Sequence, residues 1–412
     1  MEPSTAHECE TLPPLDPSAK RSDWLVLMPL WLMVLAVSSQ VMVVSPVLPR
    51  IEAELGIAES KLGFIVSGYA ISLAVFALVV GPISDRVGRR RVILAGTGIM
   101  TAALGMHAFA NDFWSLVGVR ILAGAAGGAL TGSAVAYVGD YFPYTRRGWA
   151  SGWVMSGFAV GQILGVPSGA LLAEAYGFRS AFVLFALVCA VAFVMTLIFV
   201  PQPDVERGGS ADVRSALRRY RALLQQRSVA YSAMAYATMF FSVSSFVVYF
   251  PKWAESSKGL TPGNIASMFM VGGVASVIFG VQTGKLSDRV GRKPLILASC
   301  WGTTALFLAV PWFVVGNLTA HVFLFLAMVL VAMRVSPFQA LLTALSGARE
   351  RGSLMSLVVA LGQLGGGLGA AMAGSTFGRF GFTGCAVVAA ISVAFTGVFV
   401  LVGVPEPEPE AA

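Results

Sequence analysis

Charged residues are scarce in this sequence, and their scarcity excludes most soluble proteins. Asp, Glu, Lys and Arg make up 12% of the 412 residues, whereas 56% are hydrophobic and the mean hydropathy is +0.77. A soluble domain carries roughly a quarter charged residues. Long apolar runs indicate membrane-spanning helices, because a helix satisfies its own backbone hydrogen bonds in hydrocarbon. The composition therefore predicts an all-α membrane protein.

Cysteine and histidine are also sparse. The four cysteines and three histidines are scattered along the chain, without the spacing of a metal site or a disulfide framework. Glycine-rich runs lie inside apolar segments and lack the strand and the Lys-Ser/Thr pair of a phosphate-binding loop. We therefore expect no metal, no cofactor and no enzymatic activity. The polar N-terminus lacks the features of a signal peptide, so the first apolar run is expected to be an uncleaved span.

Twelve apolar runs are long enough to cross a bilayer. They cover residues 24–46, 60–82, 92–110, 114–139, 150–173, 179–200, 230–251, 263–285, 294–315, 320–344, 353–376 and 381–403. The predicted organisation is an N-terminal tail (1–23), a six-helix bundle (24–200), a cytoplasmic linker (201–229), a second six-helix bundle (230–403) and a C-terminal tail (404–412). Within the linker, residues 215–224 are predicted to form an amphipathic helix on the membrane surface.

Lysine and arginine are distributed unevenly among the loops. With the N-terminus in the cytoplasm, twenty of the 28 are cytoplasmic and two lie within spans. The six outside are Arg50, Lys61, Arg179, Lys252, Lys258 and Arg379. This distribution follows the positive-inside rule, and an even number of spans places both termini in the cytoplasm. The net charge of +7 is thereby explained by topology, so we expect a lipid bilayer and no nucleic acid as partner.

One charged loop motif occurs twice, beginning at residues 81 and 284, which are 203 residues apart. Both copies read Gly-x-x-Ser-Asp-Arg-Val-Gly-Arg. Basic residues alone would fix topology, but that function does not explain the repeated Asp and Gly. We interpret the motif as a gating device, in which glycine permits close backbone approach and the aspartate faces a helix N-terminus. Its residues are Gly81, Asp85, Arg86, Gly88 and Arg89, and Gly284, Asp288, Arg289, Gly291 and Arg292.

With these loops, the chain resembles the major facilitator superfamily over residues 24–403. Span four contains Arg120, Gly124 and Gly128 at four-residue spacing, similar to the arginine motif of that family. Span five resembles the glycine–proline motif of its drug and metabolite antiporters, with the proline one place later than usual. The residues of that motif are Gly152, Gly161, Gly165, Pro167 and Gly169. The resemblance implies two six-helix halves in pseudo-twofold repeat, alternating access and a site near the midplane.

The resemblance also implies partners for the first loop. Arg89 is expected to pair with Asp140 at the cytoplasmic end of span four, and Asp85 to face span eleven. The second half has Ala344 in the place of Asp140, so its contact should be weaker.

Span one departs from the family pattern at a position that matters for coupling. Gln40 lies nine residues before Pro49, where many drug:proton antiporters of the family carry an aspartate. No Asp or Glu lies near the middle of any predicted span. The usual proton-coupling carboxylate is therefore absent, and a proton and another counter-ion both stay open as coupling partners.

The substrate and coupling candidates are the few polar and aromatic residues within spans. Arg120 and Arg334 are the only cations there, and each should face protein or water. For Arg120 a substrate role and a scaffold role weigh equally, whereas for Arg334, close to Pro337, we favour substrate or coupling. The other candidates are Gln40, Gln339, Phe338, Tyr69, Tyr236 and Gln363, for which helix packing is the alternative role.

Three hypotheses of function follow. The leading one is a monomeric secondary transporter in the inner membrane, which exports a small organic compound, a drug or a metabolite. The second is an organic-anion carrier that uses Arg334 and Arg120. The third is a receptor or scaffold that does not transport, and the paired gating loops argue against it.

Overall fold

The computed structural model describes residues 17–203, 213–344 and 351–405, and it places helices and no strands within these ranges. The first half comprises α1 (Pro17–Met42), α2 (Val44–Leu55), α3 (Glu59–Val87), α4 (Arg89–Met106), η1 (His107–Phe109), α5 (Phe113–Tyr141), α6 (Tyr144–Val160), η2 (Gly161–Gly165), α7 (Val166–Tyr176) and α8 (Phe178–Phe199). The second comprises α9 (Val213–Gln225), α10 (Arg227–Val247), α11 (Phe250–Lys258), α12 (Pro262–Val290), α13 (Arg292–Phe313), α14 (Asn317–Ala344) and α15 (Arg351–Gly403).

Twelve spans result from these helices. Eleven segments of the described chain are long and apolar enough to cross a membrane, and the last of them, Ser353–Gly403, has 51 residues. A single span needs about 20 residues, and the backbone of Gly381 breaks α15 with φ 63° and ψ −166°. The last segment therefore contains two spans, and the predicted all-α fold of twelve membrane helices is confirmed.

Three of the predicted spans are interrupted helices. Span one continues from α1 into α2, span five runs through α6, η2 and α7, and span seven continues from α10 into α11. The interruption at η2 is a π-helical turn directly before Pro167, where the amide of Val166 donates to the carbonyl of Gly161. A π turn contains an extra residue compared with an α turn, and it lies where the proline is displaced by one place.

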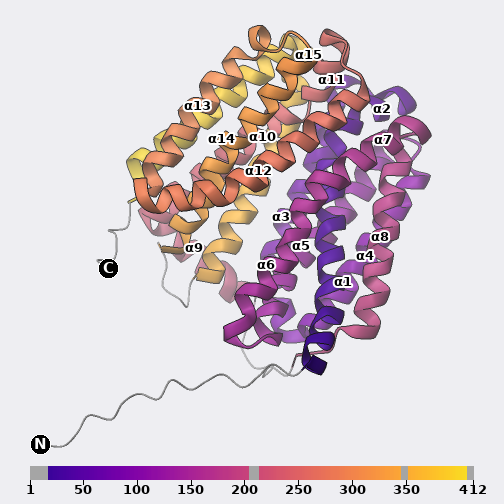
Figure 1. The fold of residues 1–412 in the computed structure, drawn as a ribbon, viewed down its shortest axis with the longest axis vertical. Helices are drawn as coiled ribbons and strands as arrows, with labels where there is room; N and C mark the ends of the chain where they lie inside the picture. The colour runs from indigo at the N-terminus through magenta and orange to yellow at the C-terminus, as the bar shows by residue number, and fades with distance from the viewer. Residues whose placement is uncertain (1–16, 204–212, 345–350, 406–412) are drawn as a thin grey trace, which may run out of the picture.

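The helices gather into two groups that lie side by side (Figure 1), α1 to α8 in one and α10 to α15 in the other. The helices α2 and α11 lie at one end of the molecule, here called the α11 end. The start of α1 and the helix α9 lie toward the opposite end, here called the α9 end. The two groups meet where α3 packs against α15 and where η2 and α7 pack against α12.

Two glycines end helices at equivalent places in the halves. Gly88 follows α3 with φ 105°, and Gly291 follows α12 with φ 100°. Side chains with a Cβ rarely adopt positive φ, so glycine is required at both turns. The last glycine of each loop motif thus reverses the chain at the α9 end.

The helix α9 forms in the predicted linker. Its apolar residues Ala216, Tyr220 and Leu223 are buried against the second bundle, whereas Arg218 and Arg219 are exposed. Burial of its apolar face raises the pKa of the Tyr220 hydroxyl above its usual value. The tails at 1–16 and 406–412, and linker residues 204–212, lie outside the described residues.

Candidate functional site

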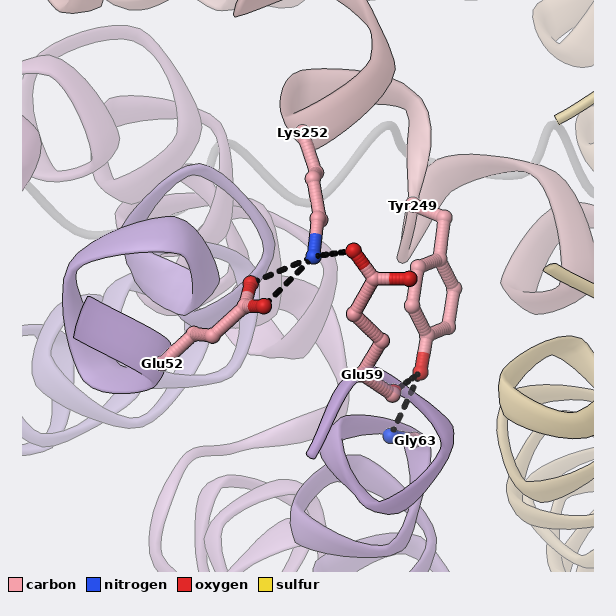
Figure 2. Close-up of polar contacts among 5 residues, drawn as sticks. All are labelled: Glu52, Glu59, Gly63, Tyr249 and Lys252. Carbon is pink, nitrogen blue, oxygen red and sulfur yellow. Dashed lines mark hydrogen bonds and ion pairs between the residues drawn. The ribbon is translucent and has the colours of Figure 1, made fainter. Parts of the chain in front are cut away.

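A lysine of the second half binds two carboxylates of the first half at the α11 end (Figure 2). The Nζ atom of Lys252, in α11, lies 2.7 and 2.6 Å from the two carboxylate oxygens of Glu52, in α2. It also lies 2.5 Å from Oε1 of Glu59, at the start of α3. The side chain of Lys252 is 12% exposed, so these charges interact in a partly desolvated setting.

A tyrosine extends the same set of contacts. The hydroxyl of Tyr249 donates to the carbonyl oxygen of Glu59 at 2.6 Å and accepts from the amide of Gly63 at 3.1 Å. Its ring stacks on Phe377 of α15, with centroids 4.8 Å apart. We call Glu52, Glu59, Gly63, Tyr249 and Lys252 the α11-end cluster. The hydrogen bonds of this cluster join the first half to the second.

Glycines allow α3 and α15 to approach closely beside this cluster. A Cβ on Gly63 would collide with the carbonyl of Ala370, and a Cβ on Gly374 would collide with the carbonyl of Ser60. Further along the same interface, a Cβ on Gly367 would press on the side chain of Ile71. Backbone cannot move aside as a flexible side chain can, so these glycines set the helix separation.

Residues of the loop motif at the α9 end contact residues of their own half. Nε of Arg89 lies 2.8 Å from Oδ2 of Asp140, as the resemblance implies, and both residues belong to the first half. Arg90 donates to the carbonyls of Val200 and Leu197 at the end of α8. In the second half, Arg292 donates to the carbonyl of Ala340 at 3.2 Å.

Part of the loop motif cannot be placed. Arg86 and Arg289 are exposed, whereas the side chains of Asp85, Asp288 and Ala344, and the surroundings of Gly81, lie outside the described residues. Gly284 lies next to Ser336 of α14. The geometry gives Arg89 its expected partner, and the gating role of the motif stays a prediction.

Arg120 is buried among uncharged partners inside the first half. It is 1% exposed, and its Nη1 donates to Oε1 of Gln40 at 2.7 Å. Its guanidinium carbon lies 4.5 Å from the ring centre of Tyr69 and 6.0 Å from that of Phe182. The amide nitrogen of Gln40 and the hydroxyl of Tyr69 have no hydrogen-bond partner. These sequence candidates thus meet at one site, which joins α1, α3, α5 and α8.

The glycine motifs of spans four and five position these helices. Any Cβ on Gly124 or Gly128 would collide with the backbone of α3, which keeps α5 close to Tyr69. A Cβ on Gly161 or Gly165 would collide with serine side chains of α1, and a Cβ on Gly169 would collide with Val43, directly after α1. Gly152 has no neighbouring atom within 4 Å of its Cβ position, so no contact in the described structure requires glycine there. Pro167 follows the π turn of η2.

Arg334 is buried in the second half, and it is distant in sequence from the residues of the α11-end cluster. It is 1% exposed, and its Nη1 donates to Oγ1 of Thr303 at 2.8 Å. Its Nε and Nη2 have no hydrogen-bond partner. Because Thr303 belongs to α13, the guanidinium is directed into the second bundle.

The remaining candidates lie on α10, α14 and α15 in the second half. The rings of Tyr236 and Phe338 are buried, with centroids 5.7 Å apart, and Gly362 leaves space for Tyr236. Gln339 is exposed and faces the Tyr236 hydroxyl. Gln363 is half-buried. Tyr236, Phe338 and Gln339 are therefore neighbours, whereas Arg334 binds a different helix.

Sequence reasoning missed the α11-end cluster. It placed Lys252 on the outer side of the membrane without a partner, and Tyr249 was not among its substrate and coupling candidates. A signal was present, since Pro251-Lys252 aligns with Pro49-Arg50 of the first half and marks the same end of the bundle. That signal does not identify Glu52 and Glu59 as partners.

Comparisons with known proteins agree with this architecture. The sequence profile described as Major Facilitator Superfamily matches residues 30–366 and 259–412. The chain belongs to the major facilitator superfamily. Its fold also resembles the crystal structure of a D-xylose-proton symporter, with a TM-score of 0.78 and 16% identity over 94% of this chain and 99% of that chain. A human organic anion transporter, MFSD10, matches with a TM-score of 0.67 and 16% identity, over 94% and 100% of the chains.

Several curated relatives are multidrug resistance proteins named MdtG. The protein from Proteus mirabilis is 29% identical over 66% of this chain and 69% of its own length. That from Escherichia coli O81 is 26% identical over 95% and 96%. An uncharacterised transporter of the superfamily, YwfA from Bacillus subtilis, is 26% identical over 90% of each chain. Membership of the superfamily and location in a membrane follow from these matches and from the spans.

Proposed function

We propose that this protein is a secondary active transporter that exports small organic compounds by alternating access. The observation that carries the proposal is the α11-end cluster, whose hydrogen bonds join the two halves at one end of the molecule. At the α9 end, Arg89 pairs with Asp140 of its own half. Contacts that hold the halves together at one end are what a transporter needs in one of its two states.

The orientation in the membrane comes from the distribution of lysine and arginine. The loops at the α9 end contain Arg86, Arg89, Arg90 and Arg91, and Lys285, Arg289, Arg292 and Lys293. We assign this end to the cytoplasm, with both termini on that side of an inner membrane. The α11-end cluster then faces outward, and the described conformation is the one closed to the outside.

The substrate class is proposed from the relatives. Relatives that match along nearly the whole chain are named for multidrug resistance, which favours export of drug-like or metabolite-like compounds. We expect the protein to work as a monomer of two pseudo-symmetric bundles, over residues 24–200 and 230–403, joined by the linker at 201–229.

Coupling through span one is proposed not to involve a proton. Arg120 is bound to the neutral amide of Gln40, at 2.7 Å, and an amide does not release or take up a proton as a carboxylate does. Tyr69 and Phe182 add ring contacts and no acid. This site therefore supports a structural role for Arg120 in the first half.

A flux measurement in proteoliposomes tests the proposal. Cationic, neutral and anionic drug-like compounds are loaded with and without an imposed pH gradient, and empty liposomes are the control. We expect flux of at least one organic compound that does not depend on the pH gradient. No flux of any compound would reject the exporter, whereas strict dependence on the gradient would reject only the coupling proposal.

A further inference from the structure

Arg334 presents an unused pair of donors inside the second bundle. Nη1 donates to Thr303, whereas Nε and Nη2 have no hydrogen-bond partner although the residue is 1% exposed. Nε and Nη2 form one edge of the guanidinium group, with two parallel N–H donors. This edge is the one that binds a carboxylate through two hydrogen bonds.

The charge on this group cannot be removed by deprotonation, because arginine stays protonated in proteins. Arg334 lies ten residues before Ala344, the last residue of α14, which corresponds to about 15 Å of helix. It therefore lies within the hydrophobic thickness of the bilayer. A cation at such a depth is costly unless its N–H groups have hydrogen-bond partners. Two of those of Arg334 have none, and an acid or a bound anion would supply the acceptor.

The second half contains few acidic residues that could pair with Arg334. Between Ser228 and Pro405 the acidic residues are Glu255, Asp288 and Glu350. Glu255 belongs to α11 at the far end of the bundle. Glu350 lies outside the described residues, in the loop beyond α14.

Asp288 is the nearest acid along the helices. Thr283 of α12 donates to the carbonyl of Ala332, two residues before Arg334, so it lies at nearly the same depth. Asp288 follows Thr283 by five residues, or about 7 Å along the helix axis. Its side chain lies outside the described residues, so Asp288 is an alternative partner of Arg334 that an experiment has to exclude.

We propose that Arg334 and Thr303 form a binding site for a small anion, a halide or a carboxylate group, between α13 and α14. Thr303 donates its own hydroxyl proton to the carbonyl of Ser299 at 2.8 Å, which leaves its oxygen to accept from Arg334 and fixes the guanidinium. The free edge then holds the anion with Nε and Nη2. The site lies within one half and does not depend on the proposed export.

Anion-dependent thermal stability tests this site. The purified full-length protein in detergent is held in sodium methanesulfonate, which contains no carboxylate and no halide, and bromide, chloride or benzoate is titrated at constant ionic strength. We expect a saturable rise of the unfolding temperature, since a ligand that binds only the folded state stabilises it. Saturation by bromide and chloride assigns an inorganic anion, whereas saturation by benzoate alone assigns the carboxylate of an organic molecule.

Four variants test whether the anion-dependent shift depends on Arg334 and Thr303. Arg334→Gln is expected to lose the saturable shift and Thr303→Val to weaken apparent affinity by about tenfold, as expected when a group that orients the charged donor is lost. Arg334→Lys keeps the positive charge but lacks the two parallel N–H donors of the guanidinium, so it should show intermediate affinity. Arg379→Gln removes an exposed arginine and should respond like wild type. The anion-dependent shift is the readout, so a change in basal stability does not disturb the comparison.

Three results would overturn the site. The first is an absence of any anion response in wild type, and the second is an equal response in Arg334→Gln. The third is a response that appears only after Asp288→Asn, which would mean that this aspartate already neutralises Arg334. For bromide, an anomalous diffraction peak beside the guanidinium in wild-type crystals gives independent support.

Discussion

The α11 end and the α9 end of this molecule are held together in different ways. At the α11 end, Lys252 and Tyr249 of the second half bind Glu52, Glu59 and Gly63 of the first half. At the α9 end, Arg89 pairs with Asp140 inside the first half, and Arg292 binds a carbonyl inside the second. Contacts of the first kind resist separation of the halves, whereas contacts of the second kind shape each half.

Contacts between the halves and contacts within one half have different roles in a transporter. In the proposed alternating-access cycle, ion pairs between the halves form in one conformation and break in the other, so they influence which conformation is populated. Ion pairs within a half can persist in both states. The comparison therefore predicts strong effects on conformation for the α11-end cluster and weaker ones for the pair of Arg89 and Asp140.

The largest effect is expected for Lys252→Glu. The new carboxylate would face Glu52 and Glu59, so three negative charges would replace a bound lysine. We expect transport to fall by about tenfold or more, which corresponds to about 1.4 kcal/mol or more. Flux in proteoliposomes measures it. Lys61→Glu is the matched control, because Lys61 lies at the same end and contacts Phe113 of its own half. Equal losses in both variants would contradict the comparison.

A smaller effect is expected for glycines at the interface of α3 and α15. In Gly63→Ala or Gly374→Ala the new methyl group meets a backbone carbonyl of the other half. We expect both variants to favour the state open at the α11 end, and to lower transport severalfold. Gly378→Ala in α15 meets no atom within 4 Å and should behave like wild type. If Gly378→Ala matches the other two variants, helix propensity rather than interface contact is the cause.

A qualitative change is expected for Gln40→Asp. The substitution places a carboxylate beside Arg120, whose present partner is the Gln40 amide at 2.7 Å. An ionisable pair within the membrane can take up and release a proton, so flux should become dependent on an imposed pH gradient. Gln40→Glu, with a longer side chain, tests whether geometry matters. Flux that stays indifferent to the gradient in both variants would remove this site from any role in coupling.

The smallest effect is expected for Asp140→Asn. The side chains of Arg89 and Asp140 are 19% and 26% exposed, and an exposed ion pair contributes about 0.2–1 kcal/mol. We expect transport to fall by about twofold to fivefold, in line with that energy. Arg91→Gln, an exposed arginine of the same loop, should have little effect. A loss as large as that of Lys252→Glu would show that the α9 end also controls conformation.

The sequence was sufficient for the fold because the bilayer constrains it so strongly. Apolar runs separated by charged loops located all twelve spans. The structure differs chiefly in the interruptions between α1 and α2, at η2, and between α10 and α11. The contact of Arg89 with Asp140 was also accessible, since the resemblance connects two positions of a single half. Such contacts depend on local motifs and on little else.

Contacts between halves were not accessible in the same way. Lys252 lies on α11, whereas Glu52 and Glu59 lie on α2 and α3 of the other half, and a single sequence does not show how the two halves pack against each other. A tyrosine near a span end is typical of the membrane interface, so the position of Tyr249 in the sequence does not by itself indicate a contact between the halves. Likewise, Arg334 stood out as a cation in a span, but the helix it faces depends on its rotamer and on Thr303 of α13.

The central claim is that the α11-end cluster controls which end of the transporter is open. Electron–electron distance measurements test it most directly, with spin labels at Ala53 and Ser256 for the α11 end and at Val87 and Val290 for the α9 end, all four positions being exposed. In a background without the native cysteines, we expect Lys252→Glu to lengthen the first distance and shorten the second. Unchanged distributions at both ends would contradict the account.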